Sequence, residues 1–138
     1  MIVLFLFHIL SYDVWFYVTH LLLHTKYLYW IHKIHHENKY PTFLDTYHDH
    51  WLESPIQGFG FVIPMMFMET DYLQSGLALI FVNVRGMLHH DKRGSWLVGN
   101  HHLLHHEYGH GNYGTYWIDY CCGTLLCNER PQTAITDR

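Results

Sequence analysis

Charged side chains are scarce in this sequence. Lys, Arg, Asp and Glu make up 14% of the 138 residues, about half the usual share, and the formal net charge is −4. The eight Lys and Arg residues are scattered along the chain and form no basic patch. This composition excludes a disordered tail, a nucleic-acid-binding domain and a highly charged soluble module.

Cysteine is also rare, with only Cys121, Cys122 and Cys127. An odd number of thiols, crowded near the C-terminus, argues against a disulfide framework. We expect free thiols, or acylation near a membrane, rather than a Cys/His zinc site. No arrangement of Ser or Cys with a base indicates a nucleophile.

Long apolar runs are abundant, and hydrophobic residues reach 49% of the chain. Residues 2–23 would span ~33 Å as a helix, enough to cross a bilayer core. No Lys or Arg precedes Lys26, so we expect a transmembrane helix rather than a cleaved signal peptide. Residues 51–88, interrupted by Glu69-Thr70-Asp71, predict a helical hairpin with arms of ~17 residues that crosses shallowly or dips in and returns. Its first arm contains residues that bend helices, namely Pro55, Gly58, Gly60 and Pro64.

The placement of charge predicts how these segments are oriented. The basic residues flank the inner ends of the apolar segments: Lys26, Lys33, Lys39, Arg85, Lys92 and Arg93. The hairpin tip carries only Glu69 and Asp71. By the positive-inside rule the tip and the N-terminus face away from the cytosol, and every histidine group except His8 lies on the cytosolic side.

The fold class that follows is an all-α integral membrane helical bundle with a cytosolic histidine-rich helical cap. The chain is predicted to be one domain over residues 1–138. Its parts are a transmembrane helix with the first histidine group (1–30), a second group (31–50), the membrane hairpin (51–88), a third group with the cap (89–124) and a tail (125–138).

Fifteen histidines, about one residue in nine, make the composition unusual. The pattern H-x-x-H-H occurs twice, and helical spacing of i, i+3 and i+4 places its imidazoles on one face. Together with a pair one turn apart, the firm candidate ligands are His20, His24, His32, His35, His36, His102, His105 and His106. His50 and His90, beside the ends of the hairpin, extend the set to ten. So many imidazoles suit two metals, each with an open position, and do not by themselves select Zn, Cu, Fe or Ni.

For the remaining histidines we expect ordinary structural roles: His8, His48, His89, His101 and His110. His106-Glu107-Tyr108-Gly109-His110 also matches the H-E-x-x-H pattern of zinc metalloproteases. That chemistry needs one continuous helix, which the glycines around His110 disfavour. We therefore expect the match to be coincidental.

Polar residues near the histidines are candidates for supporting roles. Asp13 lies two turns before His20 within the apolar helix, where a carboxylate needs a partner. It could orient an imidazole or bind Arg85. Hydrogen bonds from ring N–H groups of the ligands could be accepted by Glu37, Glu53, Asn112 and Asp119.

These motifs resemble the fatty acid hydroxylase/sterol desaturase superfamily, closest to its C-5 sterol desaturase and C-4 methylsterol oxidase-like branch. Asp13 with His20-Leu-Leu-Leu-His24 is similar to the first box of that family. Residues 30–37 with Pro41 resemble the second box, and His50-Trp-Leu-Glu53 resembles an H-P-L-E element. His90-Asp91 stands where sterol-modifying members place a further His, and residues 102–106, 112–114, 119 and 123–124 are similar to the closing box and tail.

The resemblance implies a short member of this family of membrane oxidoreductases. It implies two non-haem iron ions held by histidines, and attack by O2 on a C–H bond of a sterol or fatty acyl lipid, giving hydroxylation or desaturation in lipid biosynthesis. It further implies a separate electron donor such as cytochrome b5 or its reductase, and the endoplasmic reticulum or an equivalent membrane. A homo-oligomer is possible.

Two alternatives remain open from the sequence. The first is a truncated, non-catalytic metal-binding membrane protein of the same fold. The second is a zinc metalloprotease acting through His106, Glu107 and His110.

Overall fold

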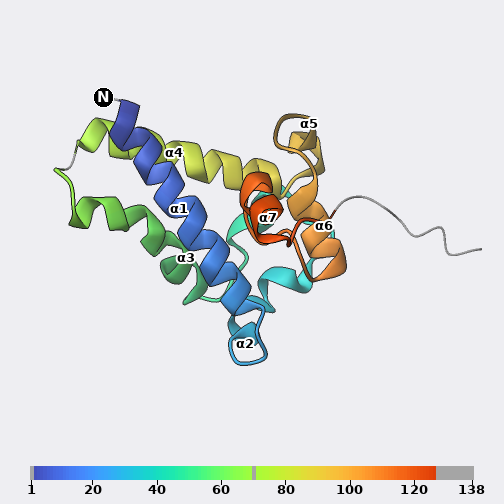
Figure 1. The fold of residues 1–138 in the computed structure, drawn as a ribbon. Coiled ribbons are helices and arrows are strands. Elements are labelled where there is room, and N and C mark those ends of the chain that lie inside the picture. Colours follow the sequence, from blue (N-terminus) through green and yellow to red (C-terminus); the bar gives the residue numbers. More distant parts are fainter. Residues whose placement is uncertain (1, 70, 127–138) are drawn as a thin grey trace, which may run out of the picture.

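The computed structural model describes residues 2–69 and 71–126, and within these ranges every regular element is a helix. Three long segments form a bundle, and short helices gather at one end of it (Figure 1). The all-helical fold class is therefore confirmed. Cys127 and most of the expected tail over 125–138 lie outside the described residues.

The first element is α1 (Ile2–Leu23), a single helix of 22 residues. It is the one helix among the described residues that is long and apolar enough to cross a membrane, with a mean hydropathy of 1.6. Its outer side exposes apolar residues at successive turns, among them Leu6, Leu10, Val14 and Val18. An apolar face that no other helix covers is what a lipid-facing helix presents.

The predicted helical hairpin is present and packs against α1. Its first arm is α3 (Glu53–Val62) followed by the 3-10 helix η3 (Ile63–Met66), where Pro64 prevents continuation of α3. Its second arm is α4 (Tyr72–His89), which starts where the Asp71 carboxylate accepts hydrogen bonds from two backbone N–H groups. The first arm, 10 plus 4 residues, spans only about 23 Å, which is less than a bilayer core.

Close contact of α1 and α3 depends on Gly60. A Cβ atom at that position would lie 2.5 Å from the Cβ of Trp15, so only glycine permits this approach. Between the three helices, Phe61, Ala78 and Val82 form a small buried core. His8 is buried there and joins all three helices, since its Nδ1 lies 3.0 Å from the Phe61 carbonyl oxygen and its Nε2 lies 3.0 Å from the Ser75 hydroxyl. The structural role expected for His8 is what the structure shows.

The short helices form a cap at the end where α1 stops. In chain order they are α2 (Tyr29–His32), η1 (His35–Glu37), η2 (Phe43–Tyr47), η4 (Lys92–Gly94), α5 (Ser95–Val98), α6 (His101–Tyr108) and α7 (Tyr116–Cys122). The periodicity predicted that the second histidine group lies on one helix, and this prediction is wrong. The group begins at the end of α2 and continues in η1 after a turn.

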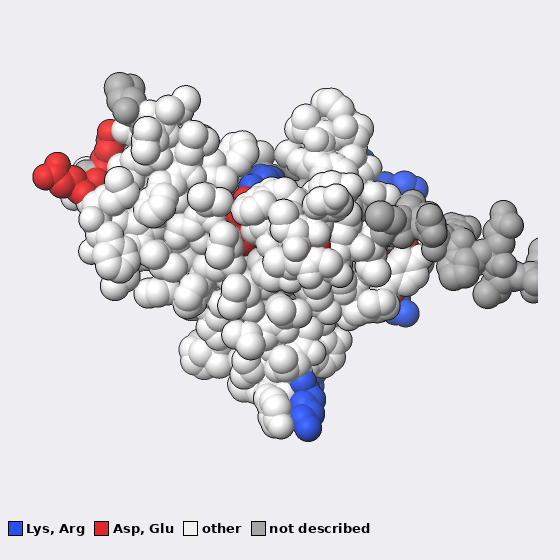
Figure 2. Space-filling view, viewed as in Figure 1, with Lys and Arg blue, Asp and Glu red and all other residues white. Residues whose placement is uncertain are grey.

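The basic residues lie away from the hairpin tip and the N-terminus, as the sequence predicted. The N-terminus and the hairpin tip lie at the same end of the molecule (Figure 1). In the view of Figure 2, the acidic side chains of the hairpin tip lie at that end and most of the visible basic side chains lie at the cap. Exposed acidic residues, such as Glu37 in η1 and Glu107 in α6, lie at the cap as well. Within the bundle, the Arg85 guanidinium pairs through two nitrogens with the Asp13 carboxylate, so α1 and α4 are also joined by an ion pair.

Candidate metal centre

Nine histidines converge under the cap in two adjacent groups. We call the first the five-His cluster: His20, His24, His32, His36 and His105. Each of these residues offers one ring nitrogen that lies within 4.8 Å of the nitrogens offered by the other four. Four contacts between Nε2 atoms run through the cluster: His20–His32 at 2.9 Å, His32–His36 at 3.1 Å, His36–His105 at 3.0 Å and His105–His24 at 3.1 Å.

The second group, the four-His cluster, comprises His35, His90, His102 and His106, all buried. The Nε2 atom of His90 lies 2.9 Å from that of His35 and 3.1 Å from that of His102. Both ring nitrogens of His106 are buried without a hydrogen-bond partner among the described residues. The two clusters touch, since the rings of His36 and His106 stack with centroids 4.7 Å apart.

Each H-x-x-H-H motif contributes to both clusters. The first and last histidines of a motif, four residues apart, enter the same cluster: His32 and His36 in one case, and His102 and His106 in the other. The middle histidine, His35 or His105, enters the neighbouring cluster. The sequence predicted three imidazoles pointing in one direction. The doubled histidine instead places adjacent residues in two neighbouring clusters.

Hydrogen bonds fix the proton on the outer nitrogen of several rings. The Nδ1 atom of His20 donates to the Tyr113 carbonyl oxygen at 2.6 Å, and that of His105 donates to the Gly111 carbonyl oxygen at 2.6 Å. His90 Nδ1 donates to the carbonyl oxygen of Gly86 at 2.8 Å. A carbonyl oxygen can only accept, so each Nδ1 carries the proton and each neutral ring directs the lone pair of Nε2 inward.

Nε2 atoms about 3 Å apart need a proton or a cation between them, because two facing lone pairs repel one another. A second proton on any of these rings is disfavoured, because burial is the main cause that lowers their pKa values. It lowers the pKa of His24 to about 3, and burial followed by the neighbouring His90 lowers that of His36 to about 4. The pKa values of His102 and His105 also lie well below the usual range, again chiefly through burial. The arrangement therefore fits metal ions held by neutral imidazoles.

The spacing of the nitrogens is short enough for neighbouring rings to bind a common ion. Two nitrogens that bind one ion at about 2.1 Å lie about 3.0 to 3.4 Å apart. The six Nε2–Nε2 contacts run from 2.9 to 3.1 Å.

Comparison with known proteins identifies the family. The family described as "Fatty acid hydroxylase" matches residues 5–124, which include all nine clustered histidines. The chain belongs to the fatty acid hydroxylase family. It is similar to methylsterol monooxygenase 1 of Rattus norvegicus, with 30% identity over 128 residues, covering 81% of this chain and 43% of the rat protein. The chain thus spans less than half the length of that relative. No solved structure matches the chain.

One predicted ligand lies outside both clusters. The His50 ring packs edge-on against Trp30, and its Nδ1 accepts the backbone N–H of Leu52 at 3.2 Å. The position of His50 beside the hairpin suggested a ligand, but its side chain contacts Trp30 and the backbone of Leu52 instead. His90, the other residue predicted from its place beside the hairpin, lies within the four-His cluster.

The predicted supporting residues divide into three groups. Glu53 does what was expected, because its Oε1 accepts from His32 Nδ1 at 2.7 Å. Glu37 is exposed and instead pairs with His48. Of the two partners expected for Asp13, an imidazole or Arg85, the structure shows Arg85. Asn112 and Asp119 are fully buried but bond to backbone rather than to a histidine ring.

Asp119 acts on the five-His cluster through a loop. Its carboxylate accepts from the backbone N–H groups of Tyr113 and Gly114 and from the Thr124 hydroxyl, at 2.7 to 2.9 Å. That loop supplies the Tyr113 carbonyl oxygen to His20. Sequence reasoning missed the carbonyl oxygens of Tyr113, Gly111 and Gly86, because backbone acceptors leave no residue-type signal. Three glycines over residues 109–114 were the available indication of a tight, buried loop.

The H-E-x-x-H match has no metalloprotease geometry. Helix α6 ends at Tyr108, where Gly109 adopts a left-handed conformation with φ of 73°. His110 lies beyond the helix, is exposed, and donates from Nδ1 to the Tyr108 carbonyl oxygen. Glu107 is also exposed. Since His106 belongs to the four-His cluster and His110 does not, the two cannot share a zinc ion in this arrangement.

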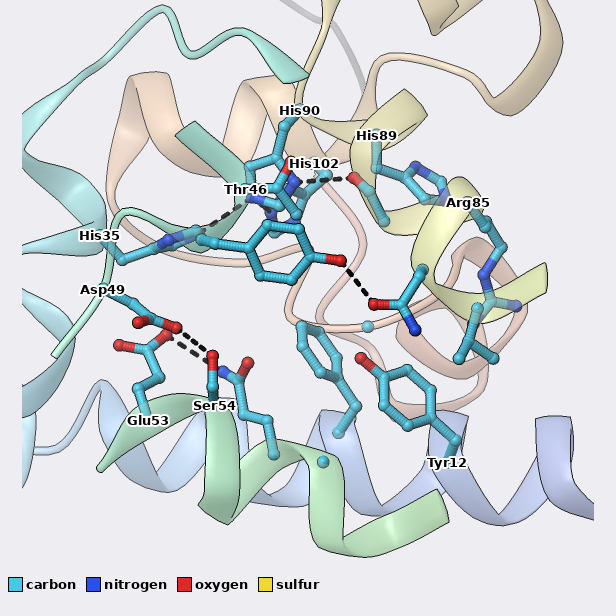
Figure 3. A pocket seen from close by; sticks show the side chains of 18 of the residues that line it. Tyr12, His35, Thr46, Asp49, Glu53, Ser54, Arg85, His89, His90 and His102 are labelled. Carbon is cyan, nitrogen blue, oxygen red and sulfur yellow. Dashed lines mark hydrogen bonds between the residues drawn. The ribbon is translucent and has the colours of Figure 1, made fainter. Parts of the chain in front are cut away.

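A cavity of about 200 Å³ reaches the four-His cluster from between α1, α3 and α4. Figure 3 shows His35, His90 and His102 along one side of it, with Asp49, Glu53 and Ser54 nearby. Tyr12, Phe16 and Val82 supply apolar wall. The four-His cluster is thus the one that a molecule in this cavity would meet.

Proposed function

We propose that this chain is the metal-binding core of an iron-dependent membrane oxidoreductase that uses O2 to hydroxylate or desaturate a C–H bond of a lipid. The observation that carries the proposal is the pair of clusters of buried imidazoles whose Nε2 atoms lie 2.9 to 3.1 Å apart. Membership of the fatty acid hydroxylase family and similarity to a methylsterol monooxygenase support the lipid-oxidising class.

The two clusters would hold two iron ions, one through His20, His24, His32, His36 and His105, the other through His35, His90, His102 and His106. Bound iron would supply the redox chemistry that activates O2 and oxidises the C–H bond. The chain supplies orientation. Glu53 and the carbonyl oxygens of Tyr113, Gly111 and Gly86 hold the rings with Nε2 inward.

The protein also controls which molecules reach the metals. The five-His cluster lies under the cap, whereas the cavity opens three imidazoles of the four-His cluster to a ligand. We assign the lipid carbon to that cavity, with its chain continuing toward the apolar surface of the bundle. An external donor such as cytochrome b5 or its reductase would supply electrons, and the cap would face the cytosol from the endoplasmic reticulum or an equivalent membrane.

Metal content tests this proposal. The full chain is produced with iron, purified in detergent and analysed for iron and zinc beside a His35→Ala/His105→Ala variant, which removes one imidazole from each cluster. Close to two irons per chain are expected, with most of the iron lost in the variant. The matched control is His48→Ala/His110→Ala, which removes two exposed imidazoles and should retain both irons.

Zinc near one equivalent, or a folded protein that binds no metal, would overturn the oxygenase proposal and leave a non-catalytic member of the same fold.

An activity assay follows when iron is bound. The iron-loaded protein is supplied with a chemical reductant and candidate lipids, and the products are identified by mass spectrometry. Incorporation of an atom from labelled O2 identifies hydroxylation, and loss of two hydrogens identifies desaturation.

A further inference from the structure

The 3-10 helix η2 forms part of the cavity wall without being packed into the bundle. Thr46, labelled in Figure 3, and Tyr47 both line the cavity. None of the five residues of η2 is buried, whereas α1, α3 and α4, which supply most of the remaining wall, each bury side chains. A segment that buries no side chain loses little packing when it moves, so it opens at a low free-energy cost.

Hydrogen bonds at both ends of η2 hold it against α4 and the turn that follows α4. At its start, the backbone N–H of Phe43 donates to Oδ2 of Asp91 at 3.2 Å, and the Arg93 guanidinium lies 5.4 Å from the centre of the Phe43 ring. At its end, the Tyr47 hydroxyl donates to Oδ1 of Asn83 at 2.5 Å. The second contact is the one that lies on the cavity wall, because both Tyr47 and Asn83 line the cavity.

Asn83 is oriented to receive this hydrogen bond. Its Nδ2 donates to the carbonyl oxygen of Leu79, one turn earlier in α4, at 2.7 Å. A carbonyl oxygen can only accept, so the NH2 group points at Leu79 and Oδ1 is left to accept from Tyr47. Tyr47 is 56% exposed although it lines the cavity, so it separates the cavity from the outside of the molecule. The bond between Tyr47 and Asn83 therefore joins two walls of the cavity near its outer side.

The cavity as the structure shows it is small for a ligand of drug size or larger. It has about 200 Å³, whereas sites for whole drug-sized ligands have about 300–1,000 Å³. A larger molecule can reach the four-His cluster only if it projects out of the cavity or if a wall moves. Since η2 is the part of the wall that buries no side chain, it is the part that can move most readily.

We propose that η2 is a lid on the cavity and that the hydrogen bond between Tyr47 and Asn83 is its latch. With the latch closed, small molecules and thin chain ends reach the four-His cluster. When the latch breaks, η2 moves away from α4 and bulkier molecules enter. Tyr47 and Asn83 thereby determine the size of the molecule that reaches the cluster. That this molecule is the lipid to be oxidised rests on the proposed function.

Thiol labelling inside the cavity tests the lid without any turnover. Thr115 lines the cavity, and its hydroxyl is buried without a hydrogen-bond partner among the described residues, so a thiol in its place breaks no hydrogen bond. Thr115→Cys is made in the full chain after Cys121, Cys122 and Cys127 have been replaced by Ser. The rate of labelling is measured with a small reagent, methyl methanethiosulfonate, and with a bulky one, N-(1-pyrenyl)maleimide. Iron content is measured for every variant.

Removal of the latch should speed labelling by the bulky reagent alone. Tyr47→Phe keeps the ring and removes only the hydroxyl, and Asn83→Ala removes the acceptor. In either variant we expect the bulky reagent to react roughly fivefold faster, as for the loss of one neutral hydrogen bond, and the small reagent to change less than about twofold. Tyr40→Phe is the matched control, because Tyr40 is exposed and does not line the cavity. It should keep the original rates.

Hydrogen exchange of residues 43–48 is the second measurement, and it uses the natural cysteines. The exchange should be faster in Tyr47→Phe than in the wild type and unchanged in Tyr40→Phe. Unchanged labelling by the bulky reagent in both latch variants, an equal increase for both reagents, or unchanged exchange in Tyr47→Phe would each overturn the lid. Such results leave the metal proposal standing, since that depends on iron content. Conversely, a working latch in a chain that binds no iron would overturn the proposed oxygenase and not the lid.

Discussion

The two histidine clusters differ in how firmly the protein holds them. In the five-His cluster, His20, His32 and His105 are anchored through Nδ1 by a carbonyl or carboxylate oxygen. In the four-His cluster only His90 has such an anchor, while Nδ1 of His35 and both nitrogens of His106 have no partner among the described residues. The cavity reaches the second cluster. The comparison indicates one preorganised metal site and one that is open to ligand and depends more on the metal for its shape.

Replacing a single ligand in one cluster should have the largest effect, because it removes metal from that cluster alone. We expect His106→Ala to lose about one iron per chain, from the open cluster, and to lose lipid oxidation entirely. His105→Ala should lose about one iron from the anchored cluster and also release the Gly111 carbonyl oxygen, so its melting temperature falls further. Iron analysis with thermal unfolding measures both effects. Loss of two irons from either variant would show that the clusters do not bind independently.

Acid should destabilise the metal-free protein through both clusters. Burial depresses the pKa of His36 to about 4 and that of His24 to about 3, against about 6.5 when unfolded. The unfolded state then binds protons first, so stability is complete above about pH 6.5 and falls as pH drops toward 4. From pH 6.5 to 5 a buried imidazole of this kind loses about 2 kcal/mol. The free energy of unfolding, measured as a function of pH, should fall with decreasing pH in the metal-free form. With iron bound, the same dependence on pH should be weaker.

The anchored cluster should respond to a residue that touches none of its ligands. The carboxylate of Asp119 holds the 112–114 loop by accepting hydrogen bonds from its backbone. In Asp119→Asn an amide takes its place, and the NH2 group of this amide faces backbone donors. Because this loop orients His20, we expect roughly 10–100-fold weaker metal binding at the five-His cluster. Binding at the four-His cluster should be unchanged. Chelator competition resolves the two sites, and equal weakening of both would contradict a local effect.

The smallest effect is expected from His50→Ala. His50 lies against Trp30 and not in either cluster. Two irons should remain bound, and the stability should change by about 0.5 kcal/mol or less. Loss of an iron would instead identify His50 as a further ligand that moves into a cluster when metal binds.

Sequence reasoning predicted the fold and the set of clustered residues well, for physical reasons. The apolar run over residues 2–23 determines a long helix, and the interrupted run over 51–88 determines a hairpin. Nine of ten predicted ligands converge because helical periodicity and the position of the segment ends bring them to one end of the bundle. His50 was wrongly placed with them because proximity in sequence to a segment end does not fix a side-chain direction.

The partition of the histidines into two clusters was decided only by tertiary structure. Periodicity alone placed His32, His35 and His36 on one face, but the chain leaves α2 after His32 and continues as η1, which separates the middle ring from the other two. The anchors of the rings are mostly backbone oxygens, which every residue possesses and no sequence pattern reveals. The sequence thus determined which imidazoles are available and at which end of the bundle they meet. Which nitrogen each one directs inward, and which cluster opens to a lipid, follow from loop conformation and helix packing.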